Sequence, residues 1–190
     1  MNNCFILLAA GKGKRFNSNR PKQFEYYKNK PLFMHSLEKA VRSKLFKKII
    51  LVINKKHKKN VNLNIKVIDG GNKRQDSCMN ALKYLNNKKI KNVFIHDAAR
   101  PNLSINLLKR LNRNLKKNKC VVPYTESQNS VKYQYLNKIY NLKRENVYLT
   151  QTPQCFNFKT LFNLAKKNKG LITDECSLFL KNNLKVKFIK

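Results

Sequence analysis

The feature that most constrains the fold is the alternation of short apolar runs with segments of helical periodicity along the chain. Apolar runs of this length are typical of buried strands, and helical segments between them favour crossovers that keep successive strands parallel. The sequence therefore predicts an α/β fold, a largely parallel sheet flanked by helices. The expected strands are 4–8, 48–53, 65–68, 92–96, 120–123 and 185–189, and the expected helices are 32–42, 76–85, 104–115, 159–167 and 173–181.

One expected helix shows how these elements pack. In the helix 76–85, apolar residues recur at helical spacing, so one face is expected to pack on the sheet. Asp76 or Ser77 is a candidate cap at its start. The segment 55–64 has no such pattern and is interpreted as a solvated basic loop.

The first apolar run breaks into a loop that is rich in glycine and positive charge, Gly11-Lys12-Gly13-Lys14-Arg15, and Pro21-Lys22-Gln23 follows closely. Glycines let the backbone approach a ligand, and the cations supply counter-charge, which are the requirements of a triphosphate site. A dinucleotide fingerprint would need a third glycine where Phe16 stands, and the spacing of a P-loop is absent from the sequence. The alternative is an ordinary strand-to-helix turn that is basic.

Two further strand ends carry polar residues. In an open parallel sheet, ligands bind beyond the carboxyl ends of the strands. The segment 69–77 places two glycines before a helix, and the segment 96–101 places Asp97 at a strand tip beside small residues. A single carboxylate suffices for a Mg²⁺ ion that also takes phosphate oxygens and waters. The alternatives are a helix cap for Asp97 and a surface ion pair for Arg100.

Other polar residues near these ends have simpler interpretations. His96 is interpreted as a packed or hydrogen-bonded strand residue and not as a catalyst. Asp174 and Glu175 open the last expected helix, so N-terminal capping is their simplest role.

The segment 124–148 differs from the rest of the chain. It is rich in polar and aromatic residues with partial alternation, and Asn137 stands at a plausible turn. We expect a β-arm that leaves the main body, because an exposed apolar and aromatic arm is a common means of dimerisation. The alternative is a plain surface hairpin.

Composition narrows the classes of function. The chain has 42 lysines and arginines against 9 acidic residues, a formal charge of +33. The cations are spread over the whole chain and not gathered in a tail, so compositional drift is favoured over a dedicated nucleic-acid surface. The charge would still attract small anionic substrates. Five cysteines without a CxxC pair favour free thiols in the cytoplasm and no zinc site. No apolar run approaches the length of a membrane span.

Six motifs occur in an order that carries a resemblance. Together they resemble the 2-C-methyl-D-erythritol 4-phosphate cytidylyltransferases of the non-mevalonate isoprenoid route, over nearly the whole chain. Two of the motifs, the runs 96–101 and 173–177, favour this family over the related ribitol-5-phosphate cytidylyltransferases. The motifs are Ala9-Ala10-Gly11-x-Gly13-x-Arg15, Pro21-Lys22-Gln23, Asp69-Gly70-Gly71 with Arg74 and Ser77, His96-Asp97-Ala98-Ala99-Arg100-Pro101, Thr152-Pro153-Gln154 and Thr173-Asp174-Glu175-x-Ser177.

The resemblance implies a Rossmann-like nucleotidyltransferase fold over residues 1–190, a homodimer joined through the arm, and Mg²⁺-dependent transfer of CMP from CTP. It implies that Arg15 and Lys22 are catalytic cations and that Asp97 holds Mg²⁺. The residues implied to line the nucleotide are Ala9, Ala10, Gly11, Gly13, Gly71, Ser77 and Ala98. Those implied to bind the sugar phosphate are Arg100, Arg144 and Thr173, with Ser130 in place of an expected threonine.

Members of this family usually continue past the last strand with a lysine-containing segment. This chain ends at Lys190, so we expect that segment to be missing from it. Three other hypotheses stay open at this point: a cytidylyltransferase for another polyol phosphate such as ribitol 5-phosphate, a basic nucleic-acid-binding protein, and an inactive remnant.

Overall fold

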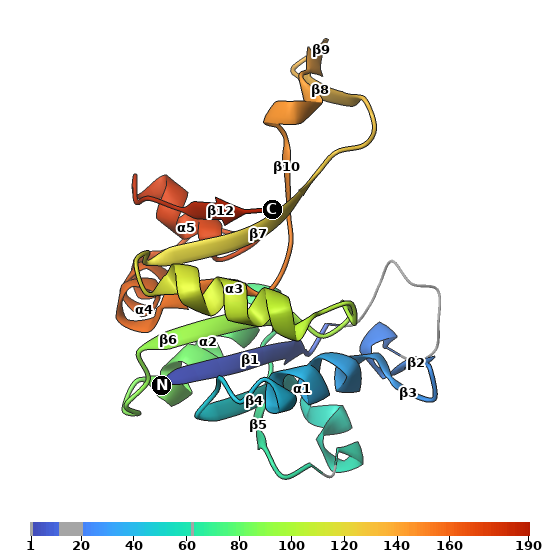
Figure 1. Cartoon of the computed structure of the whole chain (residues 1–190), viewed down its shortest axis with the longest axis vertical. Helices are drawn as coiled ribbons and strands as arrows, with labels where there is room; N and C mark the ends of the chain where they lie inside the picture. The colour runs from blue at the N-terminus through green and yellow to red at the C-terminus, as the bar shows by residue number, and fades with distance from the viewer. Residues whose placement is uncertain (1, 12–20, 62) are drawn as a thin grey trace.

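The computed structural model describes residues 2–11, 21–61 and 63–190. Within these residues, eight strands form one mixed sheet (Figure 1). The strands are β1 (Asn3–Ala9), β4 (Lys48–Ile53), β5 (Lys66–Asp69), β6 (Asn92–Asp97), β7 (Cys120–Glu126), β10 (Tyr148–Thr150), β11 (Gln154–Asn157) and β12 (Lys187–Ile189). Their order is β10-β7-β11-β6-β1-β4-β5, and β12 lies beside β7.

The centre of the sheet is parallel. Strand β1 pairs in parallel with β4 and with β6, and Leu8 stands opposite Val52 on one side and Asp97 on the other. Strand β5 pairs in parallel with β4, whereas β11 is antiparallel to both β6 and β7. The carboxyl ends of β1, β4, β5, β6 and β7 therefore meet at one edge, which confirms the predicted α/β fold with a mostly parallel sheet.

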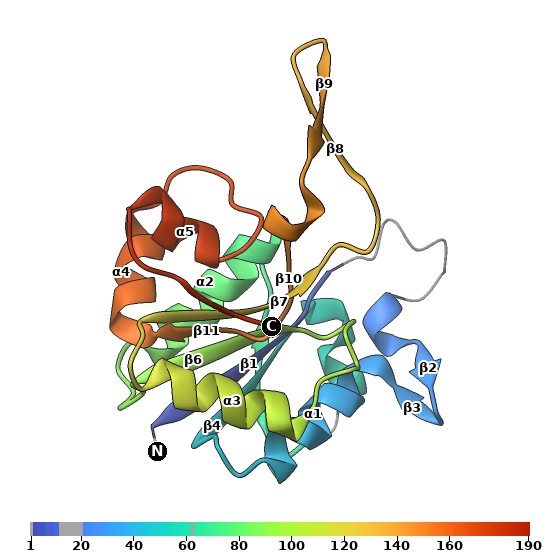
Figure 2. The same ribbon diagram turned by 45° about the horizontal axis from the view of Figure 1, so that its top comes forward.

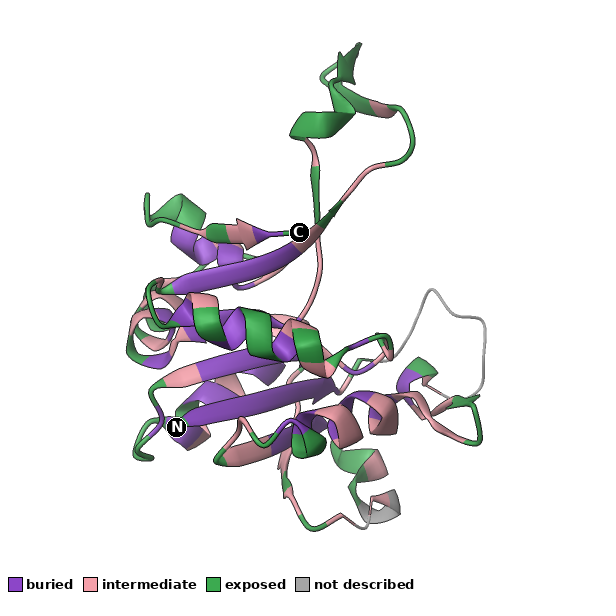
Figure 3. Cartoon of the chain, in the orientation of Figure 1, coloured by how far each residue is buried: buried purple, intermediate pink, exposed green. Residues whose placement is uncertain are grey.

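Helices cover both faces of this sheet (Figure 2). They are α1 (Leu32–Arg42), α2 (Arg74–Leu85), α3 (Ile105–Leu115), α4 (Phe158–Lys167) and α5 (Cys176–Lys181). Buried residues of α1 and α3 pack with Phe5 and Leu7 of β1, and those of α2, α4 and α5 pack with Ile6 and Leu8. Successive residues of β1 thus face opposite layers, and the strand is buried throughout (Figure 3).

The observed boundaries match the sequence-based ones at α1 and β4 and differ elsewhere. Helix α5 begins at Cys176, three residues later than predicted, because the Asp174 carboxylate accepts the Ser177 N–H (3.1 Å) from outside the helix. Helix α2 begins earlier than predicted, at Arg74. The Asp76 side chain accepts the Lys73 N–H (3.0 Å), so Asp76 takes part in capping this helix, as predicted, but from its first turn and not from the N-cap position, which Lys73 occupies.

Several short elements were not predicted. Strands β10 and β11 are antiparallel additions of three and four residues, too short to show a period. Two-residue strands β2 (Tyr26–Tyr27) and β3 (Lys30–Pro31) form a hairpin. The short helices η1 (Lys22–Phe24), η2 (Lys55–Asn60) and η3 (Arg144–Asn146) complete the chain, and η2 lies where a basic loop was expected.

The predicted arm is present as a hairpin that projects away from the sheet (Figure 1). Strands β8 (Val131–Tyr135) and β9 (Lys138–Leu142) pair antiparallel across a two-residue turn made by Leu136 and Asn137. Leu136 has a φ of 52°, the left-handed value that two-residue hairpin turns require. The hairpin leaves the carboxyl end of β7 and returns through β10, so its stem starts at the same edge as the central strand ends.

In the described part of the chain, no helix combines the length and apolarity that a membrane crossing requires. All five cysteines are buried as free thiols. Burial raises the pKa of the Cys4 thiol to about 12.

Candidate active site

The backbone that follows β1 is fixed by a glutamine. The buried side chain of Gln23 donates two hydrogen bonds, to the Ala9 carbonyl (2.7 Å) and to the Gly11 carbonyl (2.9 Å). Lys22 precedes Gln23 at the start of η1 and is exposed, and the two Gln23 bonds hold this segment beside the turn at the end of β1. Two other predicted residues of this loop, Gly13 and Arg15, lie outside the described residues.

The turn between β5 and α2 packs against the end of β1. A Cβ atom on Gly70 would lie 2.2 Å from the Cβ of Ala10, so only glycine allows this close approach. The Ser77 hydroxyl accepts the Gly71 N–H (3.0 Å) and donates to the Lys73 carbonyl (3.2 Å). Gly71 and Ser77 are thereby held beside Ala10, as a shared nucleotide-lining role requires.

Asp97 ends β6 at the same edge, between two guanidinium groups. Its backbone neighbour Ala98 continues the pairing with β1 through an N–H bond to the Leu8 carbonyl (3.0 Å). One Asp97 carboxylate oxygen lies 3.1 Å from Nε of Arg74, and the other lies 3.5 Å from Nε of Arg100. Arg100 also donates to the Gln151 side chain. Asp97 is therefore not a helix cap, and the ion pair predicted as the alternative for Arg100 is present.

His96 precedes Asp97 in β6, and its ring forms hydrogen bonds with residues on either side of Asp97. Burial lowers the pKa of His96 to about 4, although bonds to neighbouring groups oppose this. In the neutral ring, Nδ1 accepts from the Thr152 hydroxyl (2.8 Å), and Nε2 donates to the Arg100 carbonyl (3.0 Å). The Thr152 oxygen in turn accepts the Asp97 N–H (3.4 Å). His96 is a hydrogen-bonded strand residue, as the sequence indicated.

A loop before α5 brings Thr173 to this edge. Asp174 accepts a hydrogen bond from the Gln154 amide (2.8 Å) and caps α5, while the Thr173 side chain stays exposed. Glu175 is buried and does not cap the helix with its side chain. Instead it accepts two bonds from one terminal nitrogen of Arg74, at 2.7 and 2.8 Å.

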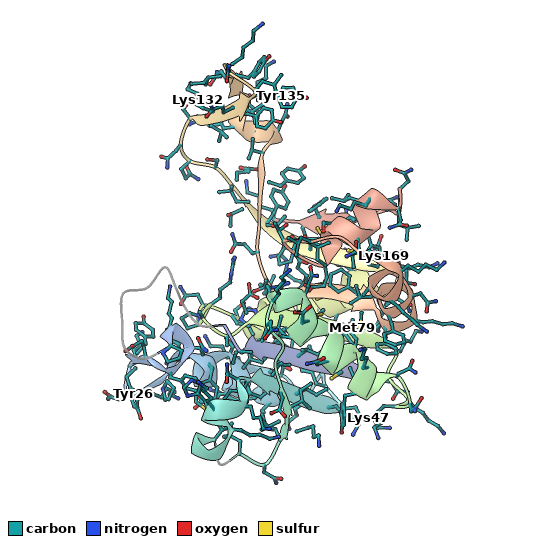
Figure 4. The ribbon with its side chains drawn as sticks, turned by 180° about the vertical axis from the view of Figure 1, so that it is seen from behind. Tyr26, Lys47, Met79, Lys132, Tyr135 and Lys169 are labelled. Carbon is teal, nitrogen blue, oxygen red and sulfur yellow. The ribbon has the colours of Figure 1, made fainter. Side chains whose placement is uncertain are left out.

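Two predicted substrate residues lie on the arm and not in this cluster. Ser130 is exposed just before β8, and Arg144 donates to the Gln128 carbonyl (3.1 Å) within the stem of the arm. Figure 4 shows the far end of the arm, marked by Lys132 and Tyr135, well away from the body that carries Met79.

Sequence reasoning named Gln23, Arg74 and Gln154 as motif members but gave them no role. The structure shows that each one ties two separate segments together. Their presence in short motifs was the available signal. The partners lie up to 101 residues away, a distance over which spacing carries no information.

The donor set at this edge limits which metal could bind. Among the described residues, no group of three or more histidine, cysteine or acidic side chains is placed to hold a metal ion. Asp97 offers hard carboxylate oxygens, which suit Mg²⁺, but both oxygens face guanidinium groups. The residues thus fit a Mg²⁺ ion that takes most of its ligands from a triphosphate and water, and do not fit a cage made of protein alone.

The turn after β1, the close contact of Gly70 with Ala10 and the carboxylate of Asp97 all lie at the carboxyl edge of a mostly parallel sheet, where α/β proteins bind nucleotides. The sequence model of the family "2-C-methyl-D-erythritol 4-phosphate cytidylyltransferase" (IspD) matches residues 3–190. The chain belongs to that family, which confirms the resemblance seen in the sequence.

Individual relatives agree with this assignment. The chain is 50% identical over 194 residues to a bifunctional enzyme IspD/IspF of Pelagibacter ubique, an alignment that spans all of this chain and 52% of that protein. The chain therefore covers about half the length of this relative. It is 34% identical over 193 residues to a 2-C-methyl-D-erythritol 4-phosphate cytidylyltransferase of Clostridium botulinum, covering 91% of this chain and 81% of that protein.

Solved structures show the same fold. A 4-diphosphocytidyl-2C-methyl-D-erythritol synthase from Anaerococcus prevotii superposes with a TM-score of 0.86 at 28% identity, over 98% of this chain and 86% of that one. The bifunctional IspDF from Campylobacter jejuni gives a TM-score of 0.86 at 30% identity, over 100% of this chain and 50% of that one.

Proposed function

We propose that this protein transfers CMP from CTP to 2-C-methyl-D-erythritol 4-phosphate and releases pyrophosphate. The observation that carries the proposal is the position of Asp97, which ends β6 between two arginines and pairs with β1, the strand that leads into the Ala10–Gly70 contact. Membership of the IspD family supports the choice of substrates. The predictions of one domain over residues 1–190 and of a cytoplasmic location stay predictions.

The nucleotide would lie along the ends of β1 and β5. Ala9, Ala10, Gly11, Gly71, Ser77 and Ala98 would line it, with Gly13 on the loop outside the described residues. Three of these six residues are alanines and two are glycines, so contacts would come mainly from the backbone and would select the base by its size and hydrogen bonding. Lys22, with Arg15, would offset the charge that gathers on the α-phosphate.

Asp97 would contribute one carboxylate ligand to Mg²⁺. When bound, the ion would offset negative charge on the triphosphate. Asp97 would have to exchange its longer contact, the one with Arg100 at 3.5 Å, for the metal. Arg100 is exposed and would then turn to the sugar phosphate.

In the proposed reaction, an oxygen of the 4-phosphate attacks the α-phosphorus of CTP in line with the leaving group. A new P–O bond forms, the bond from the α-phosphorus to the bridging oxygen breaks, and pyrophosphate carries away the electron pair. The attacking oxygen is already anionic, so no general base is required. The residues act by positioning the substrates and by electrostatic stabilisation.

The sugar phosphate would be bound by Arg100 and Thr173 of one chain and by Arg144 and Ser130 of the arm. Arg144 lies in the stem of the arm, where it contacts Gln128, and not in the cluster around Asp97 of its own chain. We therefore propose that it serves the site of a second copy. The arm exposes apolar side chains, including Tyr135 (57%) and Ile139 (71%). An exposed apolar surface of this kind supports the proposal of a homodimer, in which a second copy would cover it.

The test is pyrophosphate production from CTP and Mg²⁺ with each of three acceptors: methylerythritol 4-phosphate, ribitol 5-phosphate and glycerol phosphate. We expect methylerythritol 4-phosphate to be turned over at least ten times faster than the others. A preference for ribitol 5-phosphate would assign the other polyol substrate, and no turnover with any acceptor would indicate an inactive protein. Tight, salt-sensitive binding of a DNA or RNA oligonucleotide, without turnover, would instead favour a nucleic-acid-binding role.

A further inference from the structure

Arg74, the first residue of α2, contacts residues on both sides of the candidate site. Its Nε donates to an Asp97 oxygen at 3.1 Å, and its terminal nitrogen donates to both oxygens of Glu175 at 2.7 and 2.8 Å. Asp97 ends β6 and Glu175 precedes α5. One guanidinium group therefore joins the end of the central strand β6 to the loop that carries Thr173.

The two carboxylates are bound in different ways. Glu175 is buried and loses its hydration, so it depends on Arg74 for its charge compensation. Asp97 is about one third exposed and keeps a second arginine, Arg100, on its other oxygen at 3.5 Å. Although burial alone would lower it, the pKa of the Arg74 guanidinium is raised by Glu175 and Asp97, so the group stays charged. Glu175 is thus the fixed end of the bridge and Asp97 the end that can exchange partners.

The Glu175 end is fixed by its own neighbours as well. The Asp174 carboxylate accepts a hydrogen bond from the side-chain nitrogen of Gln154, and the side-chain oxygen of Gln154 accepts the Cys176 N–H (3.2 Å). The loop is therefore anchored to β11 on one side and to Arg74 on the other. Arg74, held by this anchored loop, presents its Nε to Asp97 at a defined place.

We propose that Arg74 is a positioning residue: it orients the Asp97 carboxylate for the metal-bound triphosphate and, through Glu175, makes that orientation depend on the loop that carries Thr173. The proposal rests on the proposed function, because it assigns Asp97 to the metal and Thr173 to the sugar phosphate. A lysine cannot replace Arg74, since one ammonium group does not present two donors at a fixed angle to two carboxylates.

The first experiment measures binding without turnover. CTP is titrated calorimetrically into the protein over a range of Mg²⁺ concentrations, with no sugar phosphate present. We expect Arg74→Lys and Arg74→Gln to raise the Mg²⁺ concentration for half-maximal CTP binding by about 10–100-fold, the usual effect of losing a group that orients a metal ligand. Lys83→Gln removes a charge from an exposed position of the same helix and should leave this value unchanged.

The second experiment tests the dependence on Glu175. Glu175→Gln keeps the shape of the side chain and removes its charge, and we expect it to raise both the Mg²⁺ requirement and the KM for the sugar phosphate. In the double variant with Arg74→Gln, the Glu175→Gln change should add little, because the bridge is already broken. Independent, additive effects of the two changes would contradict the proposal.

Folding and function are separated by the readouts. A merely structural role would lower the melting temperature and leave the Mg²⁺ requirement of the folded fraction at the wild-type value, which would overturn the proposal. If the Arg74 variants do not fold, the Glu175→Gln variant tests the proposal, and an unchanged Mg²⁺ requirement in that variant contradicts the proposal. If the wild-type protein neither binds CTP nor turns it over, the proposed function is wrong as well. If the wild type is active and the Arg74 and Glu175 variants have the same Mg²⁺ requirement as the wild type, only the role of Arg74 is wrong.

Discussion

The side-chain amide nitrogen of Gln154, in β11, lies 2.8 Å from a carboxylate oxygen of Asp174, ahead of α5. The other end of the same amide accepts the Cys176 N–H at 3.2 Å. Gln154 is buried, so both of its polar atoms are used inside the protein. One side chain thus links the antiparallel strand of the sheet to the start of the last helix.

Gln154→Leu should therefore destabilise the protein. The change leaves the Cys176 N–H without its partner and removes one bond from Asp174, and each loss of this kind costs about 1–3 kcal/mol. We expect a fall of about 2–4 kcal/mol in the free energy of unfolding, measured by urea denaturation. Gln134→Leu, at an exposed position of the arm, is the control and should change it by less than about 0.5 kcal/mol. Equal effects of the two changes would contradict the role of Gln154.

The two glycines Gly70 and Gly170 offer a matched pair of substitutions. A Cβ on Gly70 would lie 2.2 Å from the Ala10 Cβ, whereas a Cβ on Gly170 meets its nearest atom at 3.9 Å. Gly70→Ala should cost about 1–3 kcal/mol of stability, as overpacked sites do, and should raise the KM for CTP because it displaces the end of β1. Gly170→Ala should be neutral in both measurements. A wild-type KM and stability in Gly70→Ala would show that the turn adapts.

Removal of the Lys22 charge tests electrostatic catalysis. Lys22→Ala should lower kcat by about 10²–10³-fold, by analogy with the loss of a donor that stabilises a developing oxyanion. The melting temperature should stay within about 2 °C of wild type, since Lys22 is exposed. Lys28→Ala, in the nearby β2–β3 turn, is the control for charge alone. A kcat within a few-fold of wild type in folded Lys22→Ala would show that the assigned role is wrong.

The low pKa of His96 predicts how stability changes with pH. The folded protein keeps His96 neutral down to a pKa of about 4, while the unfolded chain binds a proton near the ordinary value of 6.5. Between these values the unfolded state holds more protons, so stability is full above pH 6.5 and is lost as the pH falls toward 4. From pH 7.5 to 5, this one group should remove about 2 kcal/mol from the free energy of unfolding.

His96→Gln isolates that contribution. Urea unfolding of the metal-free wild type and variant is compared at both pH values. The variant should be less stable at pH 7.5, because Gln replaces a bonded ring, and should lose about 2 kcal/mol less on acidification. Parallel pH profiles for the two proteins would mean that His96 titrates alike in the folded and unfolded states.

The sequence was informative where a segment's structure follows from its own residues. Helix α1 matched at both ends because Pro31 precedes an amphipathic run, and a proline tolerates the position before a helix. Strand β11 was not predicted, because its end residues Gln154 and Asn157 are polar. Gln154 binds the distant Asp174, and Asn157 caps the next helix, α4, by accepting the Thr160 N–H (3.1 Å).

The candidate site also contains residues whose place follows from local sequence and residues whose place depends on distant contacts. Asp97 ends a strand and Ser77 lies near the start of a helix, so their place at the sheet edge could be predicted from strand order. The bridge from Arg74 to Glu175 could not, because it joins residues 101 positions apart and neither one has a local pattern that requires the other. The start of α5 was misplaced for a related reason, since Asp174 and Glu175 are used by Gln154 and Arg74 before the helix begins.

The arm gives the last prediction. Its two strands expose Tyr133, Tyr135, Ile139 and Tyr140, and no face of this hairpin packs on the sheet in the described residues. If a second copy covers these side chains, charge placed among them should separate the copies, because a buried unpaired lysine is costly. Tyr135→Lys with Ile139→Lys should shift the protein from the mass of two chains to that of one in sedimentation equilibrium. Activity should fall with it, since Arg144 would no longer reach the site of a second copy. Val41→Lys, which changes an exposed apolar residue of α1 (54%), should leave the mass and the activity unchanged. A wild-type protein that sediments as one chain at micromolar concentration and is fully active would contradict both the dimer and the role of Arg144 in a shared site.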